Sequence, residues 1–419
     1  MLIEFSVENY FSIKEKQTIS LVSGKFKELT KNVYYPDEIS NLGILKSAVI
    51  YGANAAGKSN LLLAVRSMVD IIIHSSSNNL GEPLPITSFK LSSKTINAPT
   101  EFEIVFIVDG VRYQYGFSAT SDKIVDEWLF AYPKGRAQKW FERSWNDKTL
   151  EFDWDFGSYL LGEKQVWQKS TRDNALFLST AVQLNSEQLK PLFSWFKKSI
   201  KLSGVSGWSN RYSASRCMDE HKSNILNFLK SADVGINDIF VKKEKFDPNE
   251  VPNDVPDELR KAIIESMSGE DLYDISTVHI NDEGKEVRFS LGEESHGTQK
   301  LFALAGPWLD ALDSGYTILI DELHDALHPK LVTYLVNLFN DEEFNKKGAQ
   351  LIFSTHETSI LNQNIFRRDQ IWFCEKNELS ETNIYPLTDY SPRKGRENLE
   401  ASYLDGRYGA LPFITRMEK

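Results

Sequence analysis

Eight residues, 52–59, constrain the fold of this chain more than any other feature of its sequence. They read Gly-Ala-Asn-Ala-Ala-Gly-Lys-Ser and match the phosphate-binding pattern GxxxxGKS in full. A short apolar stretch, 48–51, precedes them, and the apolar residues of 58–74 recur at helical spacing. The pattern therefore predicts a P-loop, with a buried strand before it and a helix after it. A glycine turn that happens to precede a helix is the alternative, and both flanking elements disfavour it.

The residue types in this loop suit the binding of a nucleoside triphosphate and its metal ion. Glycines let backbone N–H groups turn toward the β-phosphate. Lys58 would bring positive charge to the β- and γ-phosphates, and the Ser59 hydroxyl would ligate Mg²⁺. We therefore expect ATP and Mg²⁺ as ligands. The residues expected to contact the nucleotide here are Asn54, Ala55, Ala56, Gly57, Lys58, Ser59 and Asn60.

A second set of motifs lies far along the chain. Residues 317–320 are apolar or β-branched and end in Asp321 and Glu322. We expect a buried strand that brings Asp321 to the metal ion and leaves Glu322 where it can polarise water. Strands that end in acidic residues are common, so this pattern gains weight from the Ser-His-Gly-Thr-Gln run at 295–299.

That run has the form of an ABC-type signature at the start of a helix, which we expect over 300–312. Ser295, Gly297 and Gln299 would then contact the γ-phosphate of a nucleotide bound to another subunit, since helix N-termini favour anions. The alternative is a polar loop that only caps a helix. His356 follows the apolar residues 351–353 and fits a switch histidine that contacts the γ-phosphate. Glu322 and His356 are therefore the expected catalytic pair, with Ser59 and Asp321 at the metal.

His324 and His328 could suggest a zinc site, because they stand four residues apart. The metalloprotease pattern requires Glu directly after the first histidine, and this chain has Asp325 there. No third ligand is evident in the sequence. We therefore do not expect zinc.

The composition of the chain limits which classes of protein it can belong to. A charged content of 26% and a hydrophobic content of 41% are ordinary for a globular protein. The net charge of -11 argues against a surface that is basic overall, and no apolar run is long enough to span a bilayer. The two cysteines stand in unrelated contexts, so a disulfide or zinc framework is not expected and a reducing cytoplasm fits.

The pattern of the chain predicts a discontinuous organisation. Residues 102–108 and 112–119 alternate around Asp109-Gly110, which predicts a hairpin. Apolar residues between 174 and 267 recur mainly at helical spacing. The predicted parts are an N-terminal half of an ATPase head at 1–118, an inserted lobe at 119–285 that is β and then helical, the C-terminal half of the head at 286–390, and a tail at 391–419. No sustained heptad predicts a long coiled-coil arm.

With these motifs in order, the chain resembles the ABC-type ATPases related to RecF, SMC and OLD proteins, and most of all the RloA-like and AbiL-type ATPases of bacterial defence loci. The segment 5–13 is similar to that group's first strand and turn, where residues after Asn9 approach the nucleotide base. Asp321-Glu322-Leu323, followed by Leu327-His328-Pro329, is similar to its Walker B region. The segment 403–412, Tyr-Leu-Asp-Gly-Arg-Tyr-Gly-Ala-Leu-Pro, looks like the terminal motif of the defence-associated branch.

This resemblance implies an α/β fold with an ABC-type P-loop head, in which a mixed sheet core and an antiparallel β subdomain are interrupted by a mainly helical lobe. It implies Glu322 as the hydrolytic base and His356 as the γ-phosphate sensor. Two departures stand out. His328 replaces the aspartate of transporter-type ATPases, and residues 88–91 occupy the expected place of a Q-loop without a glutamine.

The resulting hypothesis is an ATPase subunit of an anti-phage, abortive-infection system. It would form a homodimer or higher homo-oligomer on ATP and control a partner effector, with a TOPRIM-like nuclease as the expected companion. A DNA-repair clamp of RecF type is the alternative, so DNA or RNA stays open as a partner. A transporter subunit would carry a much shorter insertion, and no membrane partner is expected.

Overall fold

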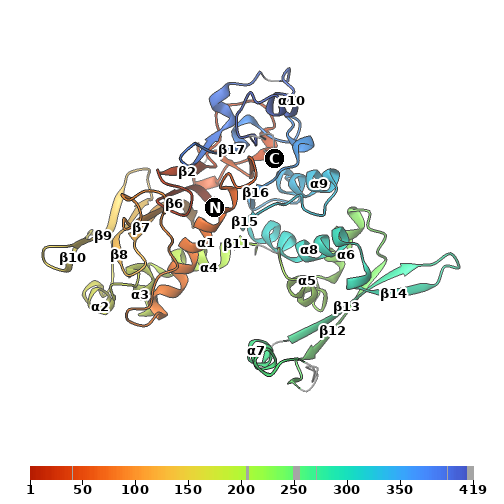
Figure 1. Cartoon of the computed structure of the whole chain (residues 1–419), viewed down its shortest axis with the longest axis horizontal. Helices are drawn as coiled ribbons and strands as arrows, with labels where there is room; N and C mark the ends of the chain where they lie inside the picture. Colours follow the sequence, from red (N-terminus) through yellow and green to blue (C-terminus); the bar gives the residue numbers. More distant parts are fainter. Residues whose placement is uncertain (40, 204–206, 249–254, 270, 394, 413–419) are drawn as a thin grey trace, which may run out of the picture. The chain divides into compact units, whose positions relative to one another are not determined.

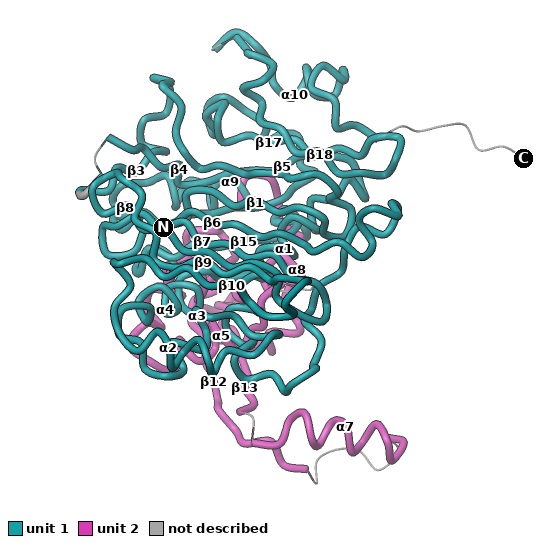
Figure 2. The backbone as a smooth tube through the Cα atoms, turned by 90° about the vertical axis from the view of Figure 1, so that its left-hand side faces the viewer, with its two compact units in different colours: residues 1–203, 311–325, 332–419 teal, residues 204–310, 326–331 magenta. Residues whose placement is uncertain are grey.

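The structure is a computed structural model that describes residues 1–39, 41–203, 207–248, 255–269, 271–393 and 395–412. It contains two compact units, which Figure 2 shows in different colours. The first unit comprises Met1–Ser203, Ala311–Asp325 and Val332–Lys419, and the second comprises Gly204–Asp310 and Ala326–Leu331. Within the described residues, no helix has the length and apolar character needed to cross a membrane.

A six-stranded sheet forms the centre of the first unit (Figure 1). All neighbouring strands are parallel except for the last pair. Every residue of β5, β15 and β16 is buried, as expected of parallel strands covered on both faces. In order across the sheet, the strands are β11 (Ile200–Leu202), β15 (Thr317–Ile320), β16 (Gln350–Ser354), β5 (Ser47–Tyr51), β17 (Ile371–Lys376) and β18 (Thr382–Pro386).

The order of the central strands places the sequence motifs side by side. The glycine loop follows β5, His356 follows the neighbouring β16 by two residues, and Asp321 directly follows β15. Because the strands are parallel, these three carboxyl ends lie at the same edge of the sheet. The fold class is thus the predicted α/β head with a mixed sheet, and the edge that carries the site is the one expected for this class.

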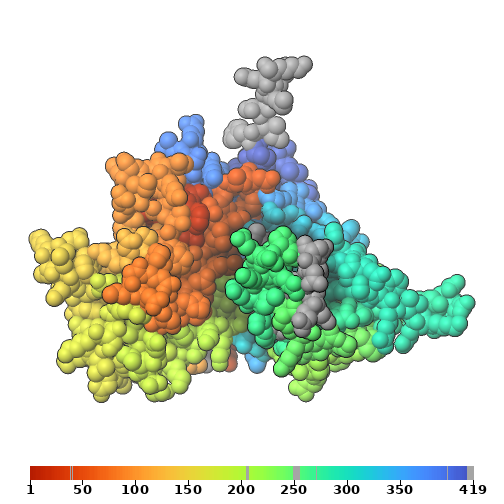
Figure 3. Space-filling view, turned by 60° about the horizontal axis from the view of Figure 1, so that its bottom comes forward, coloured from red at the N-terminus to blue at the C-terminus, as the bar shows by residue number. Residues whose placement is uncertain are grey.

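A second, antiparallel sheet of seven strands completes the first unit. The predicted hairpin around Asp109-Gly110 is confirmed, with Val108 paired to Val111. Both turn residues have positive φ, which Gly110 adopts freely. In spatial order, the strands are β10 (Glu151–Phe156), β9 (Gln138–Asn146), β8 (Ile124–Tyr132), β7 (Val111–Ala119), β6 (Thr100–Val108), β1 (Leu2–Glu8) and β2 (Gln17–Ser20). The hairpin of β9 and β10, yellow in Figure 3, forms one end of this sheet.

The helices of the first unit pack on these sheets. Helix α1 (Lys58–His74) has the bounds that the apolar spacing predicted. Helices α2 (Lys164–Ser170), α3 (Phe177–Gln183) and α4 (Lys190–Ser199) join the same core, where Trp195 stacks on Phe106 with ring centroids 4.4 Å apart. The segment from 119 to 203 is therefore built into the first unit. The sequence placed the start of the inserted lobe at 119, whereas the structure continues the sheet through β8–β10 and begins its second unit at Gly204.

The C-terminal segment is also part of the first unit. After α9 (Pro329–Asn340) and the last two sheet strands, α10 (Leu399–Leu404) brings Tyr403 and Tyr408 onto Phe373 of β17, with ring centroids 5.4 and 5.5 Å away. Tyr408 is fully buried. The predicted tail, 391–419, therefore packs onto the central sheet through Tyr403 and Tyr408, and residues 394 and 413–419 lie outside the described residues.

The second unit combines helices with a three-stranded antiparallel sheet of β12 (Asp238–Lys245), β13 (Asp271–Ile280) and β14 (Glu286–Ser290). Helices α5 (Asn210–Cys217), α6 (Lys222–Ser231) and α7 (Asp257–Met267) and most of α8 (His296–Ser314) belong to it. Arg216 on α5 pairs with Asp310 on α8 at 2.6 Å. The helical spacing predicted for the middle of the chain is confirmed by α5 and α6. The long strand β13 did not emerge from the pattern, and residues 286–310, assigned by sequence to the head, lie in this unit.

Candidate nucleotide-binding site

The glycine loop owes its path to close approaches that only glycine permits. A Cβ atom at Gly52 would lie 2.1 Å from the carbonyl oxygen of Cys374 on β17. At Gly57, where φ is 112°, it would lie 2.2 Å from the hydroxyl of Thr382 on β18. Ala55 between them also has a positive φ of 61°. The loop is therefore packed tightly against the end of the sheet before α1 begins at Lys58.

Lys58 lies inside the loop that precedes it. Its Nζ donates to the carbonyl oxygens of Gly52 at 2.8 Å and Ala53 at 3.0 Å, and it lies 3.5 Å from Nε2 of His356. The residue is 5% exposed, and burial lowers the pKa of its ammonium group. A buried cation held only by neutral groups within hydrogen-bonding distance favours an anionic ligand beside it.

Asp321 is held by hydroxyl groups from two other elements. Ser59 donates to its Oδ2 at 2.5 Å, and Ser354 donates to its Oδ1. The Ser354 hydroxyl also accepts from the backbone N–H of Glu322 at 2.9 Å. Ser354 thus fixes both acidic residues of the motif. Ser354 ends the strand that precedes His356, and no sequence motif indicated its role.

Glu322 and His356 lie next to each other at the mouth of the site. Glu322 Oε1 is 3.3 Å from His356 Nε2. Burial, and then the charge of Lys58, lowers the pKa of His356, so the neutral imidazole is favoured. Glu322 has a φ of 49°, an uncommon conformation for a non-glycine residue. Its carboxylate can accept a proton from a water molecule placed at the phosphates.

The oxygen groups of Ser59 and Asp321 fit a magnesium ion. They meet at 2.5 Å beside the loop, and hard oxygen ligands suit this ion. In the parts of the chain that the structure describes, no group of three or more His, Cys, Asp or Glu side chains could hold a metal. Mg²⁺ is commonly bound through one or two protein groups together with phosphates and water. Ser59 and Asp321 would hold it here, where it would neutralise phosphate charge.

One cavity of about 400 Å³ collects most of the predicted residues. The glycine loop and the start of α1 form one side of this cavity. There, the side-chain amide of Asn60 donates to the hydroxyl of Ser12 at 2.6 Å. Lys376 at the end of β17 also lines it, and no sequence motif indicated this residue. The lining residues are Asn54, Ala55, Ala56, Gly57, Lys58, Ser59, Asn60, Glu322, His356 and Lys376.

The signature residues lie in the second unit. Ser295 Oγ accepts from the N–H of Thr298 at 3.2 Å and so caps the first turn of α8. Gln299 Nε2 donates to the Glu294 carbonyl oxygen at 2.8 Å. A Cβ at Gly297 would lie 2.8 Å from the carbonyl oxygen of Ala326, so this backbone approach requires glycine. The local geometry is that of an ordered helix start, and its contact with a nucleotide stays a prediction.

Two sequence features have structural explanations. Residues 323–326 form a turn and α9 begins only at Pro329, so His324 and His328 do not share a helix face. His324 instead packs edge-on against His356, with ring centroids 5.6 Å apart.

Asn9 is buried, and its side chain binds the loop at 89–98 through the N–H of Phe89 and the carbonyl oxygen of Thr95. Asn9 therefore has a structural role in positioning this loop.

Three adjacent parallel strands that end in a glycine loop, a histidine and an Asp-Glu pair place this chain among the P-loop nucleoside triphosphatases. Among solved structures, it is similar to the SMC head domain from Thermotoga maritima, with 13% identity, a TM-score of 0.39, and coverage of 92% of this chain and 98% of that one. No curated protein matches it. The family model described as "AAA domain, putative AbiEii toxin, Type IV TA system" matches residues 47–362, and the chain belongs to this family.

Proposed function

We propose that this protein is an ATP-hydrolysing switch that controls a partner effector in bacterial anti-phage defence. The observation that carries the proposal is the convergence of Lys58, Glu322 and His356 on one cavity, where Ser59, which also lines it, binds Asp321. A phosphate-binding lysine, a metal-binding carboxylate and a potential general base are the parts that triphosphate hydrolysis requires. The family to which the chain belongs supports the ATPase assignment.

The geometry suggests how these residues act on ATP. Lys58 exchanges its two carbonyl partners for phosphate oxygens, which relieves the cost of burying its charge. Glu322 orients a water molecule and accepts its proton as the water attacks the γ-phosphate. His356, neutral at pH 7, donates a hydrogen bond to the γ-phosphate of ATP. This hydrogen bond is lost when hydrolysis leaves ADP, which has no γ-phosphate.

Assembly on ATP is the second part of the proposal. Ser295 and the N-terminus of α8 form an anion-favouring helix start, which would contact the γ-phosphate on a second copy. ATP would then join two subunits before hydrolysis and release them afterwards. Because the chain would act as a switch, the damaging activity would belong to a partner in the cytoplasm, for which a TOPRIM-like nuclease remains the expected candidate. The family's description, which names a putative toxin and a toxin–antitoxin system, supports a role in a system of two components, whereas the assignment of the damage to the partner rests on the switch alone.

The test compares two substitutions that separate binding from hydrolysis. Lys58→Ala is expected to abolish ATP binding, whereas Glu322→Gln is expected to bind ATP and to hydrolyse it at least about a hundredfold more slowly. Size-exclusion chromatography with ATP should then show a larger particle for Glu322→Gln alone. Exposed Glu378→Gln is the matched control and should behave as the natural protein. The same particle size for Glu322→Gln with and without ATP would rule out assembly on ATP.

A further inference from the structure

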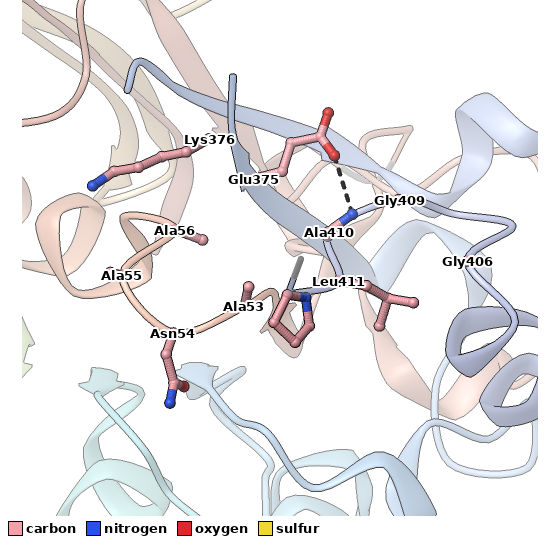
Figure 4. A pocket seen from close by; sticks show the side chains of 11 residues that line it. Ala53, Asn54, Ala55, Ala56, Glu375, Lys376, Gly406, Gly409, Ala410 and Leu411 are labelled. Carbon is pink, nitrogen blue, oxygen red and sulfur yellow. Dashed lines mark hydrogen bonds between the residues drawn. The ribbon is translucent and has the colours of Figure 1, made fainter. Parts of the chain in front are cut away.

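A second and larger cavity lies on the same glycine loop. It encloses about 690 Å³ and shares Asn54, Ala55, Ala56 and Lys376 with the phosphate cavity. Figure 4 shows the loop on one side of this cavity and the C-terminal segment from Gly406 to Leu411 on the other. The motif that distinguishes the end of this chain therefore forms a wall beside the nucleotide site. None of the roles assigned above uses this cavity.

Hydrogen bonds hold this wall in one position. The N–H of Ala410 donates to Glu375 Oε2 at 3.0 Å, and the Tyr385 hydroxyl lies 3.0 Å from the same oxygen. The Tyr385 hydroxyl is also 2.8 Å from the carbonyl oxygen of Tyr408. Gly409 has a φ of 67°, and a Cβ there would lie 2.7 Å from the Tyr385 hydroxyl. The wall is anchored on both sides of its glycine, so the cavity is preformed.

The lining combines flat apolar surfaces with a few polar groups. Ala53, Leu411 and Pro412 present small or rigid apolar surfaces, and Glu375 adds a carboxylate. Lys376 lines both cavities and is in a position to contact a phosphate. Ligand sites of this kind hold a planar apolar group and orient it with a few hydrogen bonds. A purine base with an exocyclic amino group has this shape, and its amino group can donate to a carboxylate.

We propose that this cavity binds an aminopurine nucleoside group. The proposal rests on the proposed function, since it assumes that the adjacent loop holds phosphates. The group has two sources: the base of the ATP bound to the loop, which the resemblance had instead placed near the residues after Asn9, or a separate nucleoside or nucleotide. In either case the C-terminal segment contacts the ligand directly, because its residues line the cavity.

Protection of an engineered thiol tests this site. The two natural cysteines, Cys217 and Cys374, are buried, and burial raises the pKa of each thiol to about 12. They therefore react slowly with alkylating reagents, and the alkylation of a Leu411→Cys variant can be followed above a low background. A ligand at ten times its Kd should slow that alkylation about tenfold. The probes are ATP, adenosine and inorganic tripolyphosphate.

The three probes separate the two sources. Protection by ATP, but not by adenosine or tripolyphosphate, would identify the base of the bound ATP. Protection by adenosine, retained while ATP fills the loop, would identify a separate ligand. Leu404→Cys is the matched control, because Leu404 is exposed on α10 and does not line the cavity. Each measurement is made at a protein concentration where sizing shows no ATP-dependent assembly, since a second copy could also shield the thiol.

A blocking substitution provides an independent readout. Leu411→Trp should fill part of the cavity and weaken binding of the protecting ligand at least about tenfold, while Leu404→Trp leaves it unchanged. Tripolyphosphate binding should stay the same in both variants. The proposal is overturned if neither ATP nor adenosine protects Leu411→Cys while Lys58→Ala still abolishes ATP binding. Retention of ATP binding by Lys58→Ala would instead contradict the proposed function of the loop.

Discussion

Glu400 accepts a hydrogen bond of 2.8 Å from the hydroxyl of Thr358, and this contact joins α10 to the loop that follows His356. A second contact reaches the same loop, because the Tyr51 hydroxyl donates to the Glu357 carbonyl oxygen at 3.1 Å. Tyr51 immediately precedes the glycine loop, and its ring packs against Tyr403 of α10 with centroids 5.9 Å apart. The C-terminal segment thus holds the histidine loop and the strand before the glycine loop together.

From this arrangement we predict that Thr358→Val lowers kcat for ATP hydrolysis about twofold to tenfold, which corresponds to the free energy of an ordinary net hydrogen bond. KM for ATP should change little, because Thr358 does not line the phosphate cavity. Thr358→Ser, which keeps the hydroxyl, should restore kcat. Steady-state kinetics with both variants check this. A lowered melting temperature without any change in kcat would show that the contact serves stability only.

Gly409→Ala should destabilise the protein and detach the C-terminal wall. The added Cβ would lie 2.7 Å from the Tyr385 hydroxyl, at a positive φ of 67°. Gly81 is the control, since it has a similar φ of 78° and no atom within 4 Å of an added Cβ. We expect Gly409→Ala to lower the free energy of unfolding by at least about 1 kcal/mol more than Gly81→Ala, because it adds overpacking to the shared backbone strain. Urea unfolding of both variants measures this difference, and equal losses would contradict it.

The sequence located the phosphate site better than its surroundings, for a physical reason. Lys58, Asp321 and His356 each follow a short apolar strand, and parallel strands bring such ends together without any knowledge of side-chain packing. The wall of the second cavity depends on contacts among Glu375, Tyr385 and Gly409. These residues come from different segments of the chain, so their contacts follow from tertiary packing and leave no local sequence pattern.

The boundary predicted at 118 differs from the structure for a related reason. Alternating strands look the same whether they extend an existing sheet or begin a new lobe. The strands β8–β10 extend the sheet of β1 and β6, and the buried pair of Glu127 and Arg143 then ties them to α3. The sequence alone does not reveal such an ion pair, because the register of the strands decides which side chains meet.

That pair leads to a prediction about stability. Both side chains are fully buried, and Arg143 lies 2.8 Å from Glu127. Arg143→Met should lower the free energy of unfolding by about 3–5 kcal/mol, because it leaves the Glu127 carboxylate buried without its cation. Combining it with Glu127→Gln should recover part of this loss. Chemical unfolding of the single and double variants checks the coupling, and purely additive losses would show that the charges act independently.

His356 should make stability depend on pH in a direction that can be derived. Burial lowers its pKa in the folded protein below the reference value of 6.5, so the unfolded chain binds its proton more tightly. Below pH 6.5 the unfolded state therefore gains protons first, and the free energy of unfolding falls until the pH drops below the folded-state pKa. His356→Gln removes this contribution. The difference in unfolding free energy between the natural protein and His356→Gln should be constant above pH 7.5 and should shift against the natural protein as the pH falls through 6.5. Urea unfolding at several pH values measures it, and a difference independent of pH would mean that the imidazole keeps its ordinary pKa.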